Sequence, residues 1–235
     1  LNDQWIDDGL SIAWRRADAD GIRALEGGLW RGRVFPGGAS GPAVPSVHLH
    51  AGWGHVDIHL MAARFQPRGR GAAAQSLGSV GHVHGALDCS ASLQQRVCFD
   101  GNVDVMGGSV QWEPARGDWT FALAGLTRRE QGSLVSTSGD AALRSRVSGF
   151  WADAVWRPAA GWSLAARLER LAPSNRIEGV GAALLARDAG LANGGPVTRA
   201  TLAVLHEPVA GLQLSLEGGR ERYAGGRVSH IALRA

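Results

Sequence analysis

Strict alternation of apolar and polar residues is the feature of this sequence that most limits its fold. In 10-LSIAWR-15, Leu10, Ile12 and Trp14 share one parity and polar or small residues the other. The same alternation recurs in 119–125, 162–169 and 212–217. Successive side chains of a β-strand point to opposite faces, so this pattern predicts strands whose two faces meet different environments.

The pattern predicts eleven strands, at 9–16, 22–33, 46–53, 56–65, 103–112, 119–128, 143–156, 162–170, 197–206, 212–220 and 227–235. Short connections at 17–21, 54–55, 113–118, 157–161 and 207–211 alternate with longer ones at 34–45, 66–102, 129–142, 171–196 and 221–226. Successive turns of a meander lie at opposite ends of a sheet, so the short turns should share one end. We therefore expect an all-β, antiparallel, up-and-down fold in a single domain, 1–235, with one short helix within 179–190.

Composition excludes several classes of protein. Charged residues make up 19% of the chain and 34 of 235 residues are Gly, which is unlike a soluble α/β enzyme. A hydrophobic content of 45% argues against disorder. The net charge is +3 and the arginines are scattered, so no nucleic-acid partner is expected. The sequence contains no run of 18 apolar residues, so no transmembrane helix is predicted.

The tryptophans and the polar strand positions indicate which environment each face of the sheet meets. Six of nine tryptophans flank the predicted short turns, namely Trp14, Trp53, Trp112, Trp119, Trp156 and Trp162. Aromatic rings gather where a membrane meets water. The polar faces predict lumen-lining residues at Arg15, Glu26, Gln111, Arg128, Arg167, Glu169, Arg199 and Glu217. A soluble sandwich or lipocalin-like barrel, whose apolar faces point inward, would show the same alternation and remains the alternative.

In this pattern of strands, turns and aromatic residues, the whole chain resembles the outer-membrane porins of Gram-negative bacteria. The resemblance implies a transmembrane β-barrel in the bacterial outer membrane, with short periplasmic turns and long extracellular loops, of which 66–102 is the longest. Two features depart from the family. The segment 229-SHIALRA-235 lacks a terminal aromatic residue, and the number of strands is odd. We therefore expect a strand before Leu1 and twelve or more strands in the full barrel.

Histidines cluster in the segment 46-SVHLHAGWGHVDIHLM-61. If Gly54 and His55 form a two-residue turn, His50 lies directly opposite His59, and His48 lies diagonally from it. Asp57 lies one position nearer the turn. Imidazole with an occasional carboxylate suits zinc, copper or nickel. The predicted metal ligands are therefore His48, His50, Asp57 and His59, joined by His82 and His84 of 82-HVH-84. The alternative is that these histidines are ordinary polar wall residues and solvated loop residues.

The two cysteines, Cys89 and Cys98, are nine positions apart in a segment rich in Gly and Ser. That spacing predicts a loop-closing disulfide formed in an oxidising compartment. A reduced pair is the alternative.

The porin resemblance implies a passive channel for small hydrophilic solutes, and the histidines add a predicted bias toward divalent transition metal ions such as zinc. The expected partners are outer-membrane lipid and the solutes or metal ions, with a homo-oligomer or a partner protein as further options. No cofactor is required and no catalytic residues are predicted, because a nucleophile elbow such as G-x-S-x-G is absent. The alternatives are a non-conducting barrel that binds a partner through its long loops, and a barrel enzyme.

Overall fold

The computed structural model describes residues 8–16, 20–31, 43–71, 97–137, 139–191, 195–209 and 211–234. The strands are β1 (Gly9–Arg15), β2 (Gly21–Trp30), β3 (Val44–Trp53), β4 (Val56–Phe65), β5 (Arg70–Gly71), β6 (Cys98–Trp112), β7 (Trp119–Ser136), β8 (Gly139–Ala159), β9 (Trp162–Glu178), β10 (Val197–Val209), β11 (Leu212–Tyr223) and β12 (Gly226–Arg234). The helix in this part of the chain is α1 (Ala182–Asp188).

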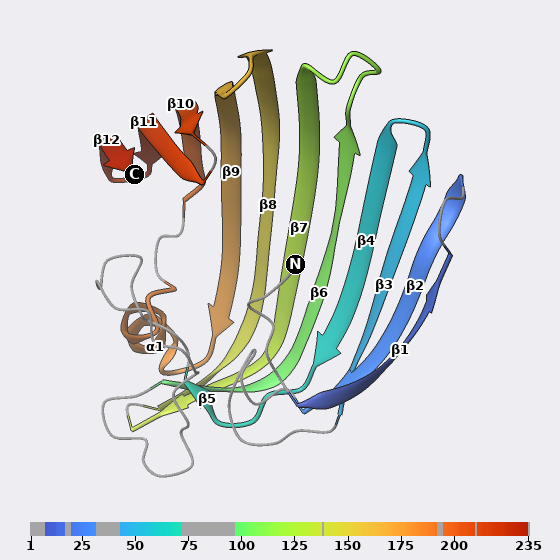
Figure 1. Cartoon of the computed structure of the whole chain (residues 1–235). Coiled ribbons are helices and arrows are strands. Elements are labelled where there is room, and N and C mark those ends of the chain that lie inside the picture. Colours follow the sequence, from blue (N-terminus) through green and yellow to red (C-terminus); the bar gives the residue numbers. More distant parts are fainter. Residues whose placement is uncertain are drawn as a thin grey trace.

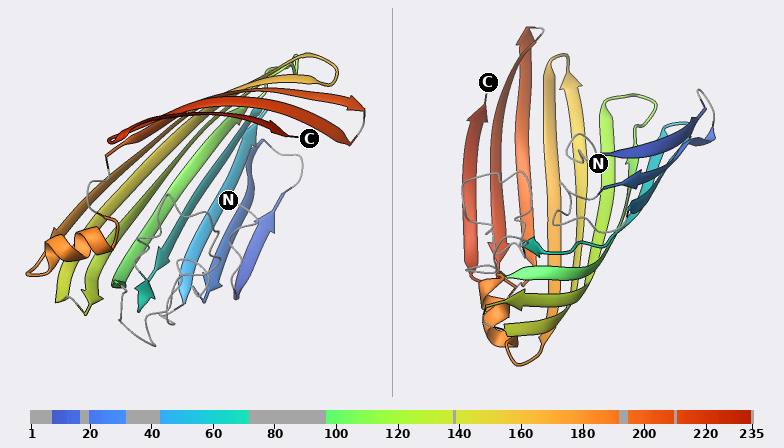
Figure 2. Two further views of the ribbon diagram at one scale, coloured as in Figure 1. Left: turned by 90° about the vertical axis from the view of Figure 1, so that its left-hand side faces the viewer. Right: turned by 90° about the horizontal axis from the view of Figure 1, so that it is seen from below.

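These strands form one antiparallel sheet in the order β1-β2-β3-β4-β6-β7-β8-β9-β10-β11-β12, with the short β5 pairing with β6. The all-β, antiparallel, up-and-down fold is thereby confirmed, and each of the eleven predicted strands and the predicted helix has a counterpart. The sheet is strongly twisted, and it is not closed: β1 and β12 stay apart at its two edges (Figures 1 and 2). The two-residue β5 was not predicted.

Two connections that were predicted to be long are short. β7 continues to Ser136 and β8 already begins at Gly139, and β11 and β12 are separated by two residues after Tyr223. The predicted loops at 129–142 and 221–226 are therefore wrong. The connections that follow β2, β4 and β9 do span many residues, and the strand ends that they join lie opposite the turns that were predicted to be short (Figure 1). We call these two ends the loop end and the turn end.

The strand register assigns the side chains to two faces, because directly paired residues point to the same side of a sheet. One face, here called the apolar face, carries exposed apolar side chains from one edge of the sheet to the other, including Leu10, Ile12, Leu25, Leu60, Leu123, Leu168, Leu202, Leu216, Ile231 and Leu233. The opposite face, here called the polar face, carries all eight of the predicted lumen-lining residues.

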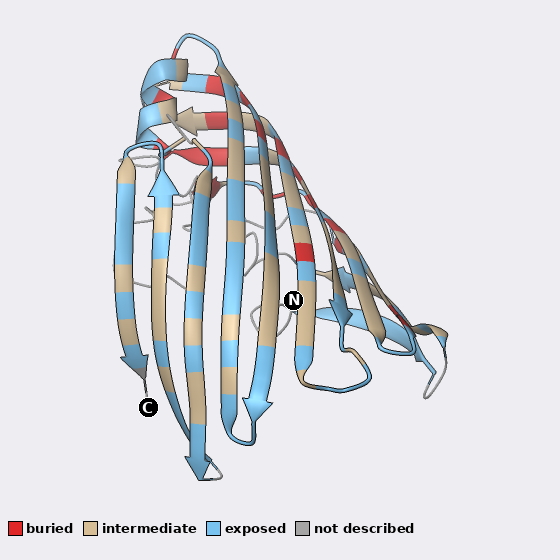
Figure 3. Cartoon of the chain, turned by 90° about the horizontal axis from the view of Figure 1, so that it is seen from above, coloured by how far each residue is buried: buried red, intermediate tan, exposed pale blue. Residues whose placement is uncertain are grey.

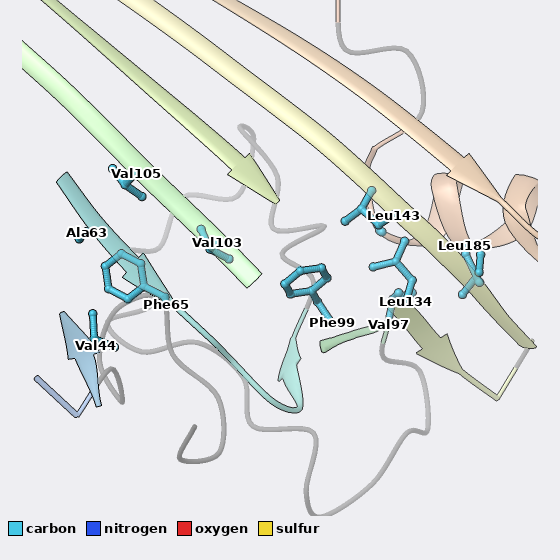
Figure 4. Packing of buried hydrophobic residues seen from close by; sticks show 12 residues of the cluster. Val44, Ala63, Phe65, Val97, Phe99, Val103, Val105, Leu134, Leu143 and Leu185 are labelled. Carbon is cyan, nitrogen blue, oxygen red and sulfur yellow. The ribbon is translucent and has the colours of Figure 1, made fainter. Parts of the chain in front are cut away.

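The buried core is small and lies at the loop end. Phe65, Phe99, Leu134, Leu143 and Leu185 are at most 2% exposed and belong to one apolar cluster (Figure 4). The four strand residues of this set lie on the polar face, so α1 packs against that face through Leu185. Figure 3 shows buried positions gathered near α1, while most of the remaining strand surface is exposed or intermediate. Within the described residues, the buried apolar cluster thus lies at the loop end.

Candidate functional site

The polar face of β2, β3 and β4 carries a cluster that we call the histidine patch, formed by Arg23, His48, His50, Asp57 and His59. The two-residue turn at Gly54 and His55 sets the register. His50 pairs directly with His59, and His48 pairs with Met61, which puts it diagonally from His59. These predicted placements are confirmed.

Short polar contacts link the members of the histidine patch. Asp57 Oδ1 lies 2.9 Å from His50 Nε2 and accepts a hydrogen bond of 2.7 Å from Arg23 Nη1. His48 Nε2 lies 3.3 Å from His59 Nδ1. The rings of His50 and His59 are stacked, with centroids 4.3 Å apart and planes 6° from parallel. The patch is therefore a group of stacked and hydrogen-bonded side chains. Its single carboxylate, Asp57, contacts both His50 and the Arg23 cation.

This geometry is not that of the predicted metal centre. Stacked rings hold their nitrogens in parallel planes, whereas ligands of a shared ion must converge on one point. One carboxylate oxygen of Asp57, Oδ1, is already engaged by Arg23. In the described ranges, no group of three or more His, Cys, Asp or Glu side chains is arranged to hold a metal ion. His82 and His84, the other predicted ligands, lie outside the described residues.

A second polar cluster crosses β8 to β12, and we call it the charge ladder. Its members are Asp153, Arg167, Glu169, Arg199, Glu217, Glu221 and His230. Arg167 donates two hydrogen bonds to Asp153, of 2.6 and 3.0 Å. Arg199 lies 2.6 Å from Glu221 and 3.7 Å from Glu169. The ladder therefore joins residues from neighbouring strands into one band of paired charges.

The ladder side chains are partly exposed. The side chains of Arg199 and Arg167 are 48% and 49% exposed, and those of their partners Glu221 and Asp153 are 26% and 20% exposed. Solvent-exposed ion pairs contribute about 0–1 kcal/mol each to stability. Such pairs add little to the fold, but they set the electrostatic potential of the face that carries them.

The remaining predicted lumen-lining residues lie on the polar face outside both clusters. Glu26 pairs in register with His48, beside the histidine patch. Gln111 donates a 2.9 Å hydrogen bond to Glu113 at the turn end. Arg15 is exposed on the edge strand β1, and Arg128 lies on β7. The structure therefore spreads these four along the face rather than bringing them together.

Several members of the two clusters were missed in the sequence. Arg23 lies where the register between β2 and β3 shifts, so simple alternation does not assign its side chain to a face. Asp153 lies between Ala152 and Ala154 of the apolar face in 151-WADAVW-156, and its parity alone would have placed it beside Arg167. Glu221 and His230 follow from the same parity rule applied to the last two strands.

A buried ion pair at the loop end was also missed. Arg70 of β5 and Glu130 of β7 are 8% and 5% exposed, and Arg70 Nη2 lies 2.8 Å from Glu130 Oε1. Arg128 lies 3.3 Å from the same oxygen, and the Arg70 guanidinium lies over the Phe99 ring. Burial lowers the pKa of Arg70, and Glu130 opposes that shift. These contacts hold β5 against the apolar cluster at the loop end.

Cys98 is buried at the start of β6 and carries no free thiol. Cys89 lies outside the described residues, so the Cys89–Cys98 disulfide stays a prediction.

No protein-family model matches this chain, and neither the curated proteins nor the solved structures include a significant match. Within the residues that the structure describes, no helix is long and apolar enough to cross a membrane.

Proposed function

We propose that the protein is an outer-membrane β-barrel that lets small hydrophilic solutes pass along its polar face. The observation that carries the proposal is the continuous apolar face, which has no protein layer over it in the described part of the chain. Ile231 and Leu202 on this face are 83% and 68% exposed. Soluble monomers rarely expose contiguous apolar patches larger than a few hundred Å².

The length of the apolar stretch on β9 fits a tilted strand that crosses a lipid bilayer. On β9 the apolar positions run from Trp162 to Leu168, and the next outward position is Arg170. The nine residues from Trp162 to Arg170 span roughly 26 Å at about 3.3 Å per residue. A tilted transmembrane strand needs about 9–11 residues, and this stretch lies at the lower end of that range.

The tryptophans at the turn end support the same orientation. The six that flank short turns, Trp14, Trp53, Trp112, Trp119, Trp156 and Trp162, are between 36% and 52% exposed. All six lie on the apolar face, and neighbours among them stack, as Trp119 does on Trp156 at 5.8 Å. Amphipathic rings in this position suit the boundary between hydrocarbon and headgroups. The turn end would then face the periplasm.

The polar face has the properties expected of a water-filled passage. The charge ladder and the histidine patch place partly exposed ions of both signs along it, and α1 packs against it at the loop end. Because lipid offers no hydrogen bonds to an open sheet edge, the proposal requires that β1 and β12 are joined, through further strands or directly. A preference for divalent metal ions remains a prediction that would need His82 and His84.

Single-channel recording in planar lipid bilayers tests this function. The full chain, refolded from detergent, should give discrete conductance steps in KCl. Arg199→Gln leaves Glu169 and Glu221 without their cation, so the permeability ratio of K⁺ to Cl⁻ should rise by about twofold or more, as for other pores lined by charged rings. Arg222→Gln removes the same charge from the opposite face and should change the ratio much less.

Membrane insertion without any conductance would contradict the channel and favour a non-conducting barrel that acts through its loops. Equal selectivity shifts in the two variants would contradict the assignment of the polar face to the passage.

A further inference from the structure

Arginines border the apolar face on its loop side. Beyond the last apolar position of β7, β8, β9, β11 and β12, the outward positions carry what we call the arginine border: Arg129, Arg144, Arg146, Arg170, Arg220, Arg222 and Arg227. All seven side chains are exposed, and they lie on the same face as the apolar residues. At the turn end, tryptophans occupy the corresponding boundary.

The arginine border lacks internal neutralisation. In the described part of the chain, no carboxylate lies within ion-pair distance of these seven residues, whereas Arg167 and Arg199 of the polar face each contact one or more carboxylates. Two pairs within the border face each other directly across neighbouring strands, Arg129 with Arg146 and Arg222 with Arg227. Arg144 likewise faces Arg176, which is paired with Glu178, and on its other side Arg129 faces Asp104, which is bonded to Arg64. Like charges directly opposite destabilise a sheet, so anions from outside the chain would stabilise this arrangement.

The position of these arginines identifies the anion. They follow the apolar band at the height where hydrocarbon gives way to headgroups, so a bound anion must be presented by the membrane itself. Arginine forms bidentate hydrogen bonds with phosphate, and it is less strongly hydrated than lysine. We propose that the arginine border binds the phosphates of anionic lipid headgroups in the leaflet on the loop side. This inference rests on the proposed function, because it assumes that the apolar face meets lipid.

Thermal unfolding in mixed micelles tests the lipid proposal. The full chain is folded in zwitterionic dodecylphosphocholine, and phosphatidylglycerol or phosphatidylcholine with the same acyl chains is titrated in. Phosphatidylglycerol should raise the unfolding midpoint, measured by circular dichroism, and phosphatidylcholine should not. In the variant Arg129→Gln with Arg146→Gln, the apparent affinity for phosphatidylglycerol should fall roughly tenfold or more, at about 1 kcal/mol per arginine near an anionic surface.

The matched control is Arg116→Gln with Arg157→Gln, which removes the same charge at the turn end and should keep the wild-type response. Without anionic lipid, the Arg129/Arg146 variant should be at least as stable as the wild type, because a repulsive pair has been removed. If this variant does not fold, Arg222→Gln with Arg227→Gln replaces it.

Equal responses of the wild type and the border variant would overturn the inference. So would an equal rise in midpoint with inorganic phosphate alone, since that would indicate a site for free anions. Failure of every variant to insert into phosphatidylcholine vesicles would instead contradict the proposed function. Insertion that occurs without any effect of phosphatidylglycerol would remove only the lipid site.

Discussion

At the scale of single residues, the buried Arg70–Glu130 pair should contribute to stability, unlike the exposed ion pairs on the surface. Glu130→Gln would leave the Arg70 guanidinium buried beside Arg128 without a carboxylate. Breaking a buried pair by removing one partner costs about 3–5 kcal/mol, and we expect such a loss in urea unfolding of the micelle-bound protein. The control Glu178→Gln breaks an exposed pair with Arg176 and should cost less than about 1 kcal/mol. Equal losses in the two variants would show that the Arg70 pair is not desolvated.

The histidine patch gives a second prediction at this scale. Because His50 and His59 are stacked and Asp57 is shared with Arg23, the double variant His50→Ala with His59→Ala should bind Zn²⁺ as the wild type does in calorimetric titration at pH 7.5. Any binding that comes from His82 and His84 should disappear in the matching double alanine variant and weaken at pH 5.5, because protons compete for imidazole nitrogen. Loss of pH-dependent binding in the His50/His59 variant would mean that the patch rearranges into a metal site.

At the scale of strands, glycine allows the backbones of β6 and β7 to approach closely near the loop end. Gly101 and Gly132 pair directly near the loop end, and a Cβ on Gly132 would run into the Asp100 carbonyl and lie 2.6 Å from the Gly101 Cα. Gly132→Ala should therefore cost about 2 kcal/mol or more of stability in urea unfolding. On the same strand, the nearest atom to a Cβ on Gly125 is 3.7 Å away, so Gly125→Ala should be neutral or slightly stabilising. Similar costs at both positions would show that the close approach at Gly132 does not require glycine.

The sequence was sufficient to predict the eleven longer strands and their order, because alternation is strong within the apolar band. It failed where strands leave that band. Beyond it, the outward positions become polar, as at Arg129, and the inward positions become apolar, as at Leu134 and Leu143, which pack against α1. The two faces thus exchange character along one strand, and the charged run 128-RRE-130 looks like a loop.

The candidate site was predictable in part for the same reason. Parity and a two-residue turn place His50 opposite His59, but they do not specify ring stacking or the reach of Arg23 from an irregular position in β2. Long-range contacts such as Arg70 with Glu130 depend on how the segment after β4 folds back, which alternation does not encode.

At the scale of the whole molecule, the central claim is that one face of the sheet meets lipid and the other meets water. A soluble barrel with the same strands would require the opposite arrangement, with the apolar face enclosed and the polar face in solvent. The two arrangements assign each residue of a strand to opposite environments, so one strand is enough to distinguish them.

The most direct measurement is a spin-label accessibility scan of β9 in phosphatidylcholine vesicles, with single cysteines at positions 163–168 and both native cysteines replaced by Ser. The account predicts that labels at Leu164, Ala166 and Leu168 collide mainly with dissolved oxygen, which concentrates in lipid. Labels at Ser163, Ala165 and Arg167 should collide mainly with a water-soluble nickel chelate. The reverse alternation, or equal access of the chelate to every position, would contradict a lipid-facing apolar face.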